Sequence, residues 1–399
     1  MNQHRENKPH IAFFGRCNVG KSTLVNILTN QNTAIISERK GTTTDAVKKS
    51  IEMLEIGACV VIDTAGLDDN SDLGQKRIQK TQEVINLIDL AAIVISENNF
   101  SDYELQLIKV LDDKNIPYII IYNKQDSCPI AETAKREVEK YCPDFICTHH
   151  NDEKAREKIT ALIKKHLITT PYGQKSILNG IINENDIVLL VTPIDVSAPK
   201  GRLILPQVKM IREILDNNGI NIVVKPEQLE YTLNNAVIKP KLVITDSQVF
   251  DTVNKIVPKD IYLTSFSILL AKEKGAFDDY LKGTPKLDDL KDGDRILMLE
   301  NCTHQPTCED IGRVKLPAMI KKYTGKNLSF TALAGLSQSE QKPEDYALVI
   351  QCGGCVATHK QLQNRLEPFK KANVPITNYG IAIAYMNGIF KRACEIFSL

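Results

Sequence analysis

The sequence predicts a three-domain α/β protein in which each domain is built around a parallel sheet. Short runs of β-branched and aliphatic residues alternate with amphipathic segments along most of the 399 residues, and a glycine-rich turn follows the first run. Alternating strands and helices are typical of parallel sheets covered by helices. A chain of this length has room for two or three domains. We place them at residues 1–170, 171–264 and 265–399.

The composition is that of an ordinary globular protein, with 43% hydrophobic and 25% charged residues. A formal net charge of +1 provides no general attraction for nucleic acid or an anionic membrane. The opening residues, MNQHRENKPH, lack the apolar core of a signal peptide, and apolar runs such as residues 90–95 are too short to span a bilayer. We therefore expect a cytoplasmic protein with no nucleic-acid partner and no membrane partner.

The ten cysteines fall into two groups, one within the first 150 residues and one after residue 300. This is not the dense spacing of a secreted disulfide framework, so free thiols or metal ligands are expected. Cys17, Cys59 and Cys394 stand in apolar contexts, where we expect them to pack as small hydrophobic residues.

The first apolar run, residues 11–14, leads into GRCNVGKS at residues 15–22 and then into an expected helix over 23–29. Strand, GxxxxGK[ST] turn and helix in this order predict a P-loop, whose glycines let backbone N–H groups surround phosphate oxygens. Lys21 is expected to reach the β- and γ-phosphates, and the Ser22 hydroxyl to ligate Mg²⁺. The nucleotide-binding residues predicted in this segment are Gly15, Asn18, Gly20, Lys21, Ser22 and Thr23.

Two further motifs follow in the order that a G protein requires. The sequence GTTTD at residues 41–45 offers Thr43, whose hydroxyl can sense Mg²⁺ and the γ-phosphate. The sequence DTAG at residues 63–66 follows an expected strand over 59–62. It places Asp63 in the outer shell of Mg²⁺ and Gly66 near the γ-phosphate.

The sequence NKQD at residues 123–126 follows an expected strand over 118–121. The Asp126 carboxylate can accept two hydrogen bonds from guanine N1–H and its exocyclic amine, which adenine does not offer, and Asn123 and Lys124 are assigned with it. The usual fifth guanine loop is weak, because residues 145–149, FICTH, lack the common Ser-Ala pair. Four motifs in order predict GTP binding. The predicted fold is therefore a P-loop GTPase followed by two smaller parallel-sheet α/β domains.

Residues 175–283 repeat strand–helix units and carry no nucleotide motif. The expected strands are 186–191, 220–224, 241–244 and 260–263, and the expected helices are 205–217, 227–235, 248–256 and 266–274. A small sheet domain without evident chemistry suits assembly, so we expect dimerisation here.

The last third places cysteines at the ends of expected strands. The strands are 295–299, 328–332, 346–350 and 375–379, and the helices are 314–323, 359–371 and 381–396. Cys302 and His304 follow the first strand, and Cys352-Gly-Gly-Cys355 follows the third. The carboxyl ends of parallel strands share one edge, where ligands bind, and thiolates suit iron–sulfur clusters or zinc. We expect a metal site, with a redox pair, a zinc half-site or chance as alternatives for the CxxC pair alone. The turn and the following helix are expected to lower the thiol pKa values.

The GTP-binding motifs resemble those of the Era and TrmE group over residues 9 to about 168. Leu67 stands where small signalling GTPases have a water-orienting glutamine, so hydrolysis should be slow. Asn18 matches the asparagine that helps potassium-activated members hold K⁺ against the phosphates. The resemblance thus implies Lys21, Asn18 and Gly66 as the catalytic residues.

A GTPase domain followed by CxH and then CxxC resembles the FeFe-hydrogenase maturation GTPases, the HydF family, over the whole chain. The resemblance implies GTP/GDP, Mg²⁺ and a 4Fe–4S cluster held by Cys302, Cys352 and Cys355. It also implies a homodimeric scaffold that receives a diiron precursor from radical-SAM maturases and delivers it to apo FeFe-hydrogenase. Gln351 departs from the family's HCxxC pattern and is not expected to bind iron. We expect an exchangeable fourth ligand, with His304 first, Glu309 and Asp310 next, and Cys308 as the four-thiolate alternative.

The alternative from another class is an RNA- or ribosome-assembly GTPase with a structural zinc site. Its weakness is the near-neutral charge and the lack of a dense basic face in the last third. A GTP-regulated CxxC redox enzyme would leave Cys302 and His304 unexplained. Metal and sulfide content after anaerobic purification distinguishes the three.

Overall fold

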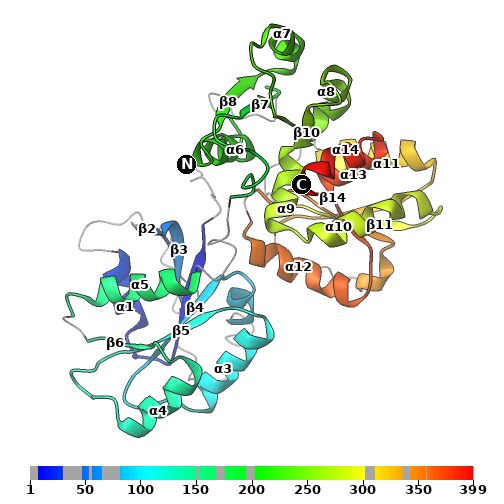
Figure 1. The fold of residues 1–399 in the computed structure, drawn as a ribbon. Helices are drawn as coiled ribbons and strands as arrows, with labels where there is room; N and C mark the ends of the chain where they lie inside the picture. Colours follow the sequence, from blue (N-terminus) through cyan, green and yellow to red (C-terminus); the bar gives the residue numbers. More distant parts are fainter. Residues whose placement is uncertain are drawn as a thin grey trace. The chain divides into compact units, whose positions relative to one another are not determined.

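A computed structural model describes residues 8–29, 47–53, 56–64, 81–149, 152–167, 176–194, 203–301, 311–335, 342–355 and 357–398. The chain divides into two compact units, Met1–Gln174 and Lys175–Leu399 (Figure 1). Within the described part of the chain, no helix is both long and apolar enough to cross a membrane.

The N-terminal unit is a six-stranded sheet in the order β2-β3-β1-β4-β5-β6, antiparallel only between β2 and β3. Its strands are β1 (His10–Phe14), β2 (Val47–Met53), β3 (Gly57–Asp63), β4 (Leu90–Ile95), β5 (Tyr118–Tyr122) and β6 (Ile146–Cys147). Its helices are α1 (Lys21–Thr29), α3 (Asp102–Asp113), α4 (Glu132–Tyr141) and α5 (Ala155–Leu167).

Helices cover both faces of this sheet, which explains why its central strands are apolar throughout. Alternate residues of β1 point to opposite faces: Phe13 packs with residues of α1 and α5, and Phe14 with residues of α3. Strand β2, at the edge, was not predicted, because its polar sequence VKKSIEM is exposed over most of its length.

The second unit contains two four-stranded parallel sheets. The middle sheet has the order β10-β9-β7-β8. Its elements are β7 (Ile187–Val191), α6 (Leu205–Asp216), β8 (Ile220–Val224), α7 (Leu229–Asn235), β9 (Leu242–Thr245), α8 (Phe250–Ile256), β10 (Tyr262–Ser265) and α9 (Phe266–Lys274). Every strand and helix expected in this region is present, with short 3₁₀ turns opening α7 and α8.

The last sheet has the order β12-β11-β13-β14. Its strands are β11 (Arg295–Leu299), β12 (Ser329–Leu333), β13 (Leu348–Gln351) and β14 (Ile376–Asn378). Its helices are α10 (Phe277–Gly283), α11 (Leu316–Thr324), α12 (His359–Lys371), α13 (Tyr379–Met386) and α14 (Phe390–Cys394). The single final helix expected over 381–396 was wrong. The helix α13 ends at Met386, and α14 begins only at Phe390. Between them Gly388 adopts a left-handed φ of 69°, a conformation that ends helices.

One hydrophobic core joins the two sheets of this unit. Leu189 and Val243 of the middle sheet belong to the same buried cluster as Leu297 and Val349 of the last sheet. The predicted fold class is confirmed: a P-loop domain followed by two parallel-sheet α/β regions. The residue boundaries assigned to the three domains stay predictions.

Candidate nucleotide site and thiol site

The turn between β1 and α1 has the tight geometry of a phosphate-binding loop. Gly15 has φ 150°, and a Cβ there would lie 2.3 Å from Val94 O. Gly20 has φ 95°, and a Cβ there would lie 2.2 Å from Asn123 Nδ2. Any side chain at either position would therefore clash, which explains both glycines of the motif. Asn18, between them, is also left-handed, with φ 61°.

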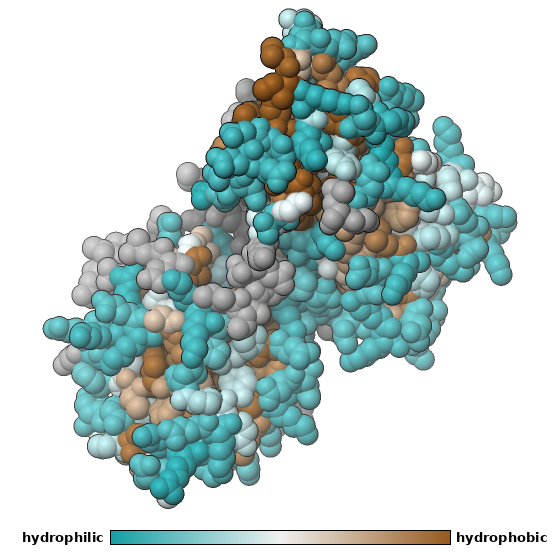
Figure 2. Space-filling view, viewed as in Figure 1, coloured by the Kyte–Doolittle hydropathy of each residue, from teal (hydrophilic) through white to brown (hydrophobic). Residues whose placement is uncertain are grey.

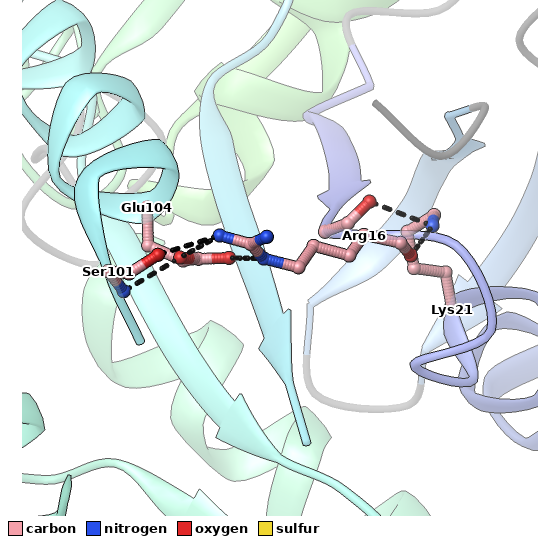
Figure 3. A network of polar contacts seen from close by, with 5 residues as sticks. Arg16, Lys21, Ser101 and Glu104 are labelled. Carbon is pink, nitrogen blue, oxygen red and sulfur yellow. Dashed lines mark hydrogen bonds and ion pairs between the residues drawn. The ribbon is translucent and has the colours of Figure 1, made fainter. Parts of the chain in front are cut away.

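The Lys21 side chain stabilises this loop by hydrogen bonds to its backbone carbonyls. Its Nζ donates hydrogen bonds to Gly15 O at 2.9 Å and Arg16 O at 2.7 Å, and the residue is 7% exposed (Figure 3). The ammonium is thus held at the centre of the loop, where a phosphate oxygen can approach it.

Arg16 ties the same loop to the first turn of α3. Its Nε lies 2.9 Å from Glu104 Oε1 and its Nη2 lies 2.8 Å from Ser101 Oγ (Figure 3). Glu104 is buried, so this ion pair anchors the P-loop to the start of α3. The motif analysis did not identify this anchor, because its two charged residues lie 88 positions apart.

Ser22 and Asp63 meet at the ends of α1 and β3. Ser22 Oγ donates to Asp63 Oδ2 at 2.6 Å. Asp63 Oδ1 is buried and has no hydrogen-bond partner among the described residues. A hydroxyl that can ligate Mg²⁺ and a carboxylate that can accept from the water shell of the ion lie side by side here, so these residues fit Mg²⁺.

The guanine motif lies beside the P-loop. Asn123 Nδ2 donates to Val19 O at 2.9 Å, and Thr148 Oγ1 donates to Asn123 Oδ1 at 3.1 Å. Gln125 N also donates to Thr148 O at 3.1 Å. Thr148 therefore connects the weak fifth loop to the guanine motif, a role that its sequence did not reveal. Asp126 is exposed, as a base-contacting carboxylate should be before nucleotide arrives.

Thr43, Gly66 and Leu67 lie outside the described residues.

Cys17 is exposed, so the expectation that it packs as a small hydrophobic residue was wrong. It lies in the P-loop turn, whose backbone faces the phosphate position rather than the core. Cys59 is buried, as expected.

The thiol site begins where β11 and β13 end side by side. These strands are parallel neighbours with Leu299 opposite Gln351, and Cys352 N donates to Leu299 O at 2.9 Å. The backbone N–H of Asn301 points at Cys352 Sγ, at 3.2 Å. Asn301 immediately precedes Cys302, the next expected ligand. The residue before Cys302 therefore already contacts the Cys352 sulfur.

Gln351 and Asn301 form a polar pair around this sulfur. Gln351 Nε2 lies 2.5 Å from Asn301 Oδ1 and 3.5 Å from Cys352 Sγ. Gln351 is fully buried, and its Oε1 has no hydrogen-bond partner in the described part of the chain. N–H groups directed at a sulfur are the surroundings of a metal-bound thiolate, so the residues present fit a thiolate-ligated metal group.

Burial dominates the acidity of the metal-free thiol. It raises the pKa of Cys352 to about 11, and the hydrogen bonds from the N–H groups of Gly354 and Asn301 lower it by less. The expected lowering was therefore wrong for Cys352 without metal. The turn supplies the N–H donors, but desolvation outweighs them. A metal that binds there must displace the thiol proton.

Of the expected ligands, only Cys352 and Cys355 lie in the described part of the chain. Cys302, His304, Cys308, Glu309 and Asp310 lie outside it. Among the described residues, no group of three or more His, Cys, Asp and Glu is placed to hold a metal ion.

Family models match three consecutive parts of the chain. Residues 177–275 match the hydrogen maturase F dimerization domain, and residues 278–396 match the hydrogen maturase F tetramerization domain. The chain belongs to the HydF family. Residues 10–124 match the model described as a 50S ribosome-binding GTPase, so this HydF protein carries its GTPase domain at the N-terminal end.

Curated relatives of this HydF chain are GTPases that match less than half of its length. The tRNA modification GTPase MnmE of Mycoplasma mycoides is 32% identical over 181 residues, which are 45% of this chain and 37% of the relative. GTPase Der of Deinococcus deserti is 30% identical over 168 residues, 39% of this chain and 37% of the relative. The chain thus spans little more than a third of the length of these relatives.

Among solved structures, Aquifex aeolicus Era bound to GDP·AlF4⁻ overlaps 55% of this chain and 93% of its own, at 17% identity and a TM-score of 0.34. The fold assignment rests on strand order and the family models rather than on this overlap.

Proposed function

We propose that this protein is a GTP-hydrolysing scaffold for hydrogenase maturation, which holds a 4Fe–4S cluster on Cys302, Cys352 and Cys355. Its cargo is a diiron precursor, received from radical-SAM maturases and delivered to apo FeFe-hydrogenase. The observation that carries the proposal is the 3.2 Å contact between Asn301 N and Cys352 Sγ. It brings the chain beside the Cys352 sulfur directly before Cys302.

The thiol site is proposed to keep one exchangeable position. Three thiolates secure the cluster, and the cluster supplies an iron atom to which a precursor or partner ligand can attach. His304 is proposed as the exchangeable protein ligand, with Glu309 and Asp310 as second choices and Cys308 as the four-thiolate alternative. The described residues contribute the N–H donors of Asn301 and Gln351 toward the Cys352 sulfur.

The nucleotide site is proposed to bind GTP and GDP with Mg²⁺. Lys21 stabilises charge on the β- and γ-phosphates, Ser22 ligates Mg²⁺ with Asp63 in the outer shell of the ion, and the guanine motif with Asp126 selects the base. Asn18 is proposed to help hold K⁺ against the phosphates, and Gly66 and Thr43 to contact the γ-phosphate region. Hydrolysis is slow, because Leu67 cannot orient a water molecule.

The protein is proposed to act as an oligomer built on its middle sheet. Strand β8 is an edge strand, and its Ile220 and Val223 are 43% and 42% exposed. Apolar surface is visible over the part of the second unit that holds β8 and α7 (Figure 2). An exposed edge with β-branched side chains favours pairing with another chain, and this segment is the one matched by the dimerization model.

The alternative of an RNA- or ribosome-assembly GTPase with structural zinc is less favoured. The two HydF domain matches cover the segment in which that alternative would place its zinc site.

The test is metal analysis of the full chain purified and reconstituted without oxygen. The proposal expects iron and sulfide in equal amounts, and loss of most iron in Cys302→Ala, Cys352→Ala or Cys355→Ala with GTP binding unchanged. Cys128→Ala, in the N-terminal unit, is the matched control and should keep its iron. Zinc without sulfide would support the alternative. A full cluster in Cys352→Ala would refute the ligand assignment.

A further inference from the structure

A lysine is buried directly behind the CGGC segment, residues 352–355. Lys274, the last residue of α9, is 2% exposed. Its Nζ donates to three backbone carbonyls of the loop that contains the cysteines: Gly354 O at 3.4 Å, Cys355 O at 3.4 Å and Ala357 O at 3.2 Å. An ammonium group has three donors, so this set of acceptors matches its charged form.

No carboxylate pairs with this ammonium among the described residues. The neighbouring Glu273 is in an ion pair with Lys209. Burying a charge without an opposite charge is expensive, and an uncompensated lysine of this kind is rare unless a further group balances it. Thiolates of the CGGC cysteines, on the loop that Lys274 contacts, would supply a balancing negative charge when they ligate a cluster.

The same face of α9 supports the rest of the loop. Ser267, Leu270 and Lys274 follow the spacing that places residues on one side of a helix. A Cβ at Gly353 would lie 3.3 Å from Ser267 Oγ and 3.8 Å from Leu270 Cδ1. The CGGC segment thus lies across this face. The helix belongs to the segment matched by the dimerization model, and the loop belongs to the segment matched by the tetramerization model.

We propose that Lys274 is a positioning residue of the thiol site, which fixes the turn around Cys355 and places a positive charge behind the ligating sulfurs. The inference rests on the proposed function, because it assumes that the CGGC cysteines ligate a cluster. Its consequence is electrostatic as well as mechanical. A buried positive charge stabilises the more negative, reduced state of a bound cluster and so raises its reduction potential.

The test compares Lys274→Met with Lys282→Met in the full chain. Methionine keeps the length of the side chain and removes the charge and all three donors. Lys282 is exposed on α10, so its loss removes the same charge from solvent. Both variants and the wild type are reconstituted with iron and sulfide. The readouts are the rate of iron loss to a chelator, the midpoint potential by redox titration, and amide hydrogen exchange over 352–358 without metal.

Lys274→Met is expected to lose iron on the order of tenfold faster. Its midpoint potential should become more negative, and its loop amides should exchange faster. Lys282→Met should match the wild type in all three. An unchanged potential in Lys274→Met would overturn the proposal, even if iron were lost faster, because a purely structural role predicts that result.

Lys274→Arg keeps the charge and covers the case in which the methionine variant does not fold. This variant is expected to keep the midpoint potential close to that of the wild type. If its metal-free loop exchanges amides at the wild-type rate but its potential shifts, the result counts against the proposal. If the wild-type chain takes up no iron, the proposed function fails. Loop exchange in the metal-free Lys274→Met chain then decides the positioning role on its own: unchanged exchange overturns it.

Discussion

At the scale of single residues, the nucleotide site depends on side chains that the P-loop holds in defined positions. Lys21 bonds to the carbonyls of its own loop, and Asn18 sits beside it in a left-handed turn. A backbone with this geometry presents the Asn18 side chain near the phosphate position without using it in the core, since the residue is exposed. This placement suits a cation ligand and is the basis of the following prediction.

GTP hydrolysis should require Mg²⁺ and run faster in KCl than in NaCl. Asn18→Ala should remove the difference between the two salts, because K⁺ loses a ligand next to the phosphates. Lys21→Ala should reduce turnover by about 10²- to 10³-fold in either salt, as expected for the loss of a charge that stabilises the transition state. Lys109→Ala, exposed on α3, is the control. Equal wild-type rates in K⁺ and Na⁺ would remove the role given to Asn18. Phosphate release at equal ionic strength measures all of these.

At this scale, a motif with fixed spacing predicts which residues share a turn, whereas a linear pattern does not show which side chains are buried. The P-loop glycines have positive φ values and Ser22 donates to Asp63, while the roles of these residues in nucleotide binding stay predictions. The acidity of Cys352 did not follow the local pattern, because it depends on burial beneath distant segments. Arg16 and Glu104 were missed for the same reason, since nothing in a linear pattern marks a pair 88 positions apart.

At the scale of elements, the two glycines of the CGGC turn have different structural demands. Gly354 has φ 63°, and a Cβ there would lie 2.7 Å from Leu362 Cδ1 of α12. Gly353 is not left-handed, and its nearest neighbour, Ser267 Oγ, would lie 3.3 Å away. The CGGC pattern alone does not distinguish the two positions, whereas the structure requires glycine chiefly at the second.

Gly354→Ala should therefore destabilise the second unit by about 1–2 kcal/mol, the cost of a left-handed non-glycine residue. It should also lower the iron retained after reconstitution. Gly353→Ala is the matched control and should change the unfolding free energy by less than about 0.5 kcal/mol. Denaturant unfolding and iron analysis of both variants measure these effects. Equal destabilisation by the two substitutions would show that the turn is not set by the conformation of Gly354.

A second element-level contact links the last turn of α5 to the segment before β6. Lys165 Nζ lies 2.7 Å and His166 Nε2 lies 3.1 Å from Asp144 Oδ2. Burial acts to raise the pKa of Asp144, but these hydrogen bonds outweigh it and lower the pKa from 3.8 to about 2. Because the folded pKa lies below the unfolded one, the carboxylate stabilises the fold above about pH 4. That contribution is lost as the pH falls toward about 2.

Asp144→Asn should lower the unfolding free energy of the N-terminal unit by about 1 kcal/mol at pH 7, since the pair is partly exposed. The difference from the wild type should shrink as the pH falls below about 4. Asp113→Asn, an exposed carboxylate at the end of α3, should show no such trend. Denaturant midpoints from pH 7 to pH 3 test this. A difference that stays constant over the range would mean that the charge of Asp144 contributes nothing.

At the scale of the whole molecule, the alternation of strands and helices was sufficient to predict three parallel-sheet regions. The order of strands within each sheet was not predictable from that alternation, because pairing depends on which crossovers pack best. The common core of the middle and last sheets, which includes Val243 and Val349, was also not predictable from the sequence pattern. Helix α9 can therefore pack against both sheets. A partner chain bound at the middle sheet would contact the same compact unit that contains the thiol loop.

Assembly should depend on the exposed edge of that middle sheet. Val223→Lys in β8 places a charge on an edge strand, a substitution that opposes pairing with another chain. It should shift the protein to smaller species in sedimentation velocity at micromolar concentration, while GTP binding stays unchanged. Val47→Lys is the matched control, because Val47 is 53% exposed on β2, the edge of the N-terminal sheet. A shift in the control alone would place the interface in the N-terminal unit. An unchanged distribution for Val223→Lys would exclude the β8 edge as the main contact, because a buried lysine there would leave its ammonium without a partner.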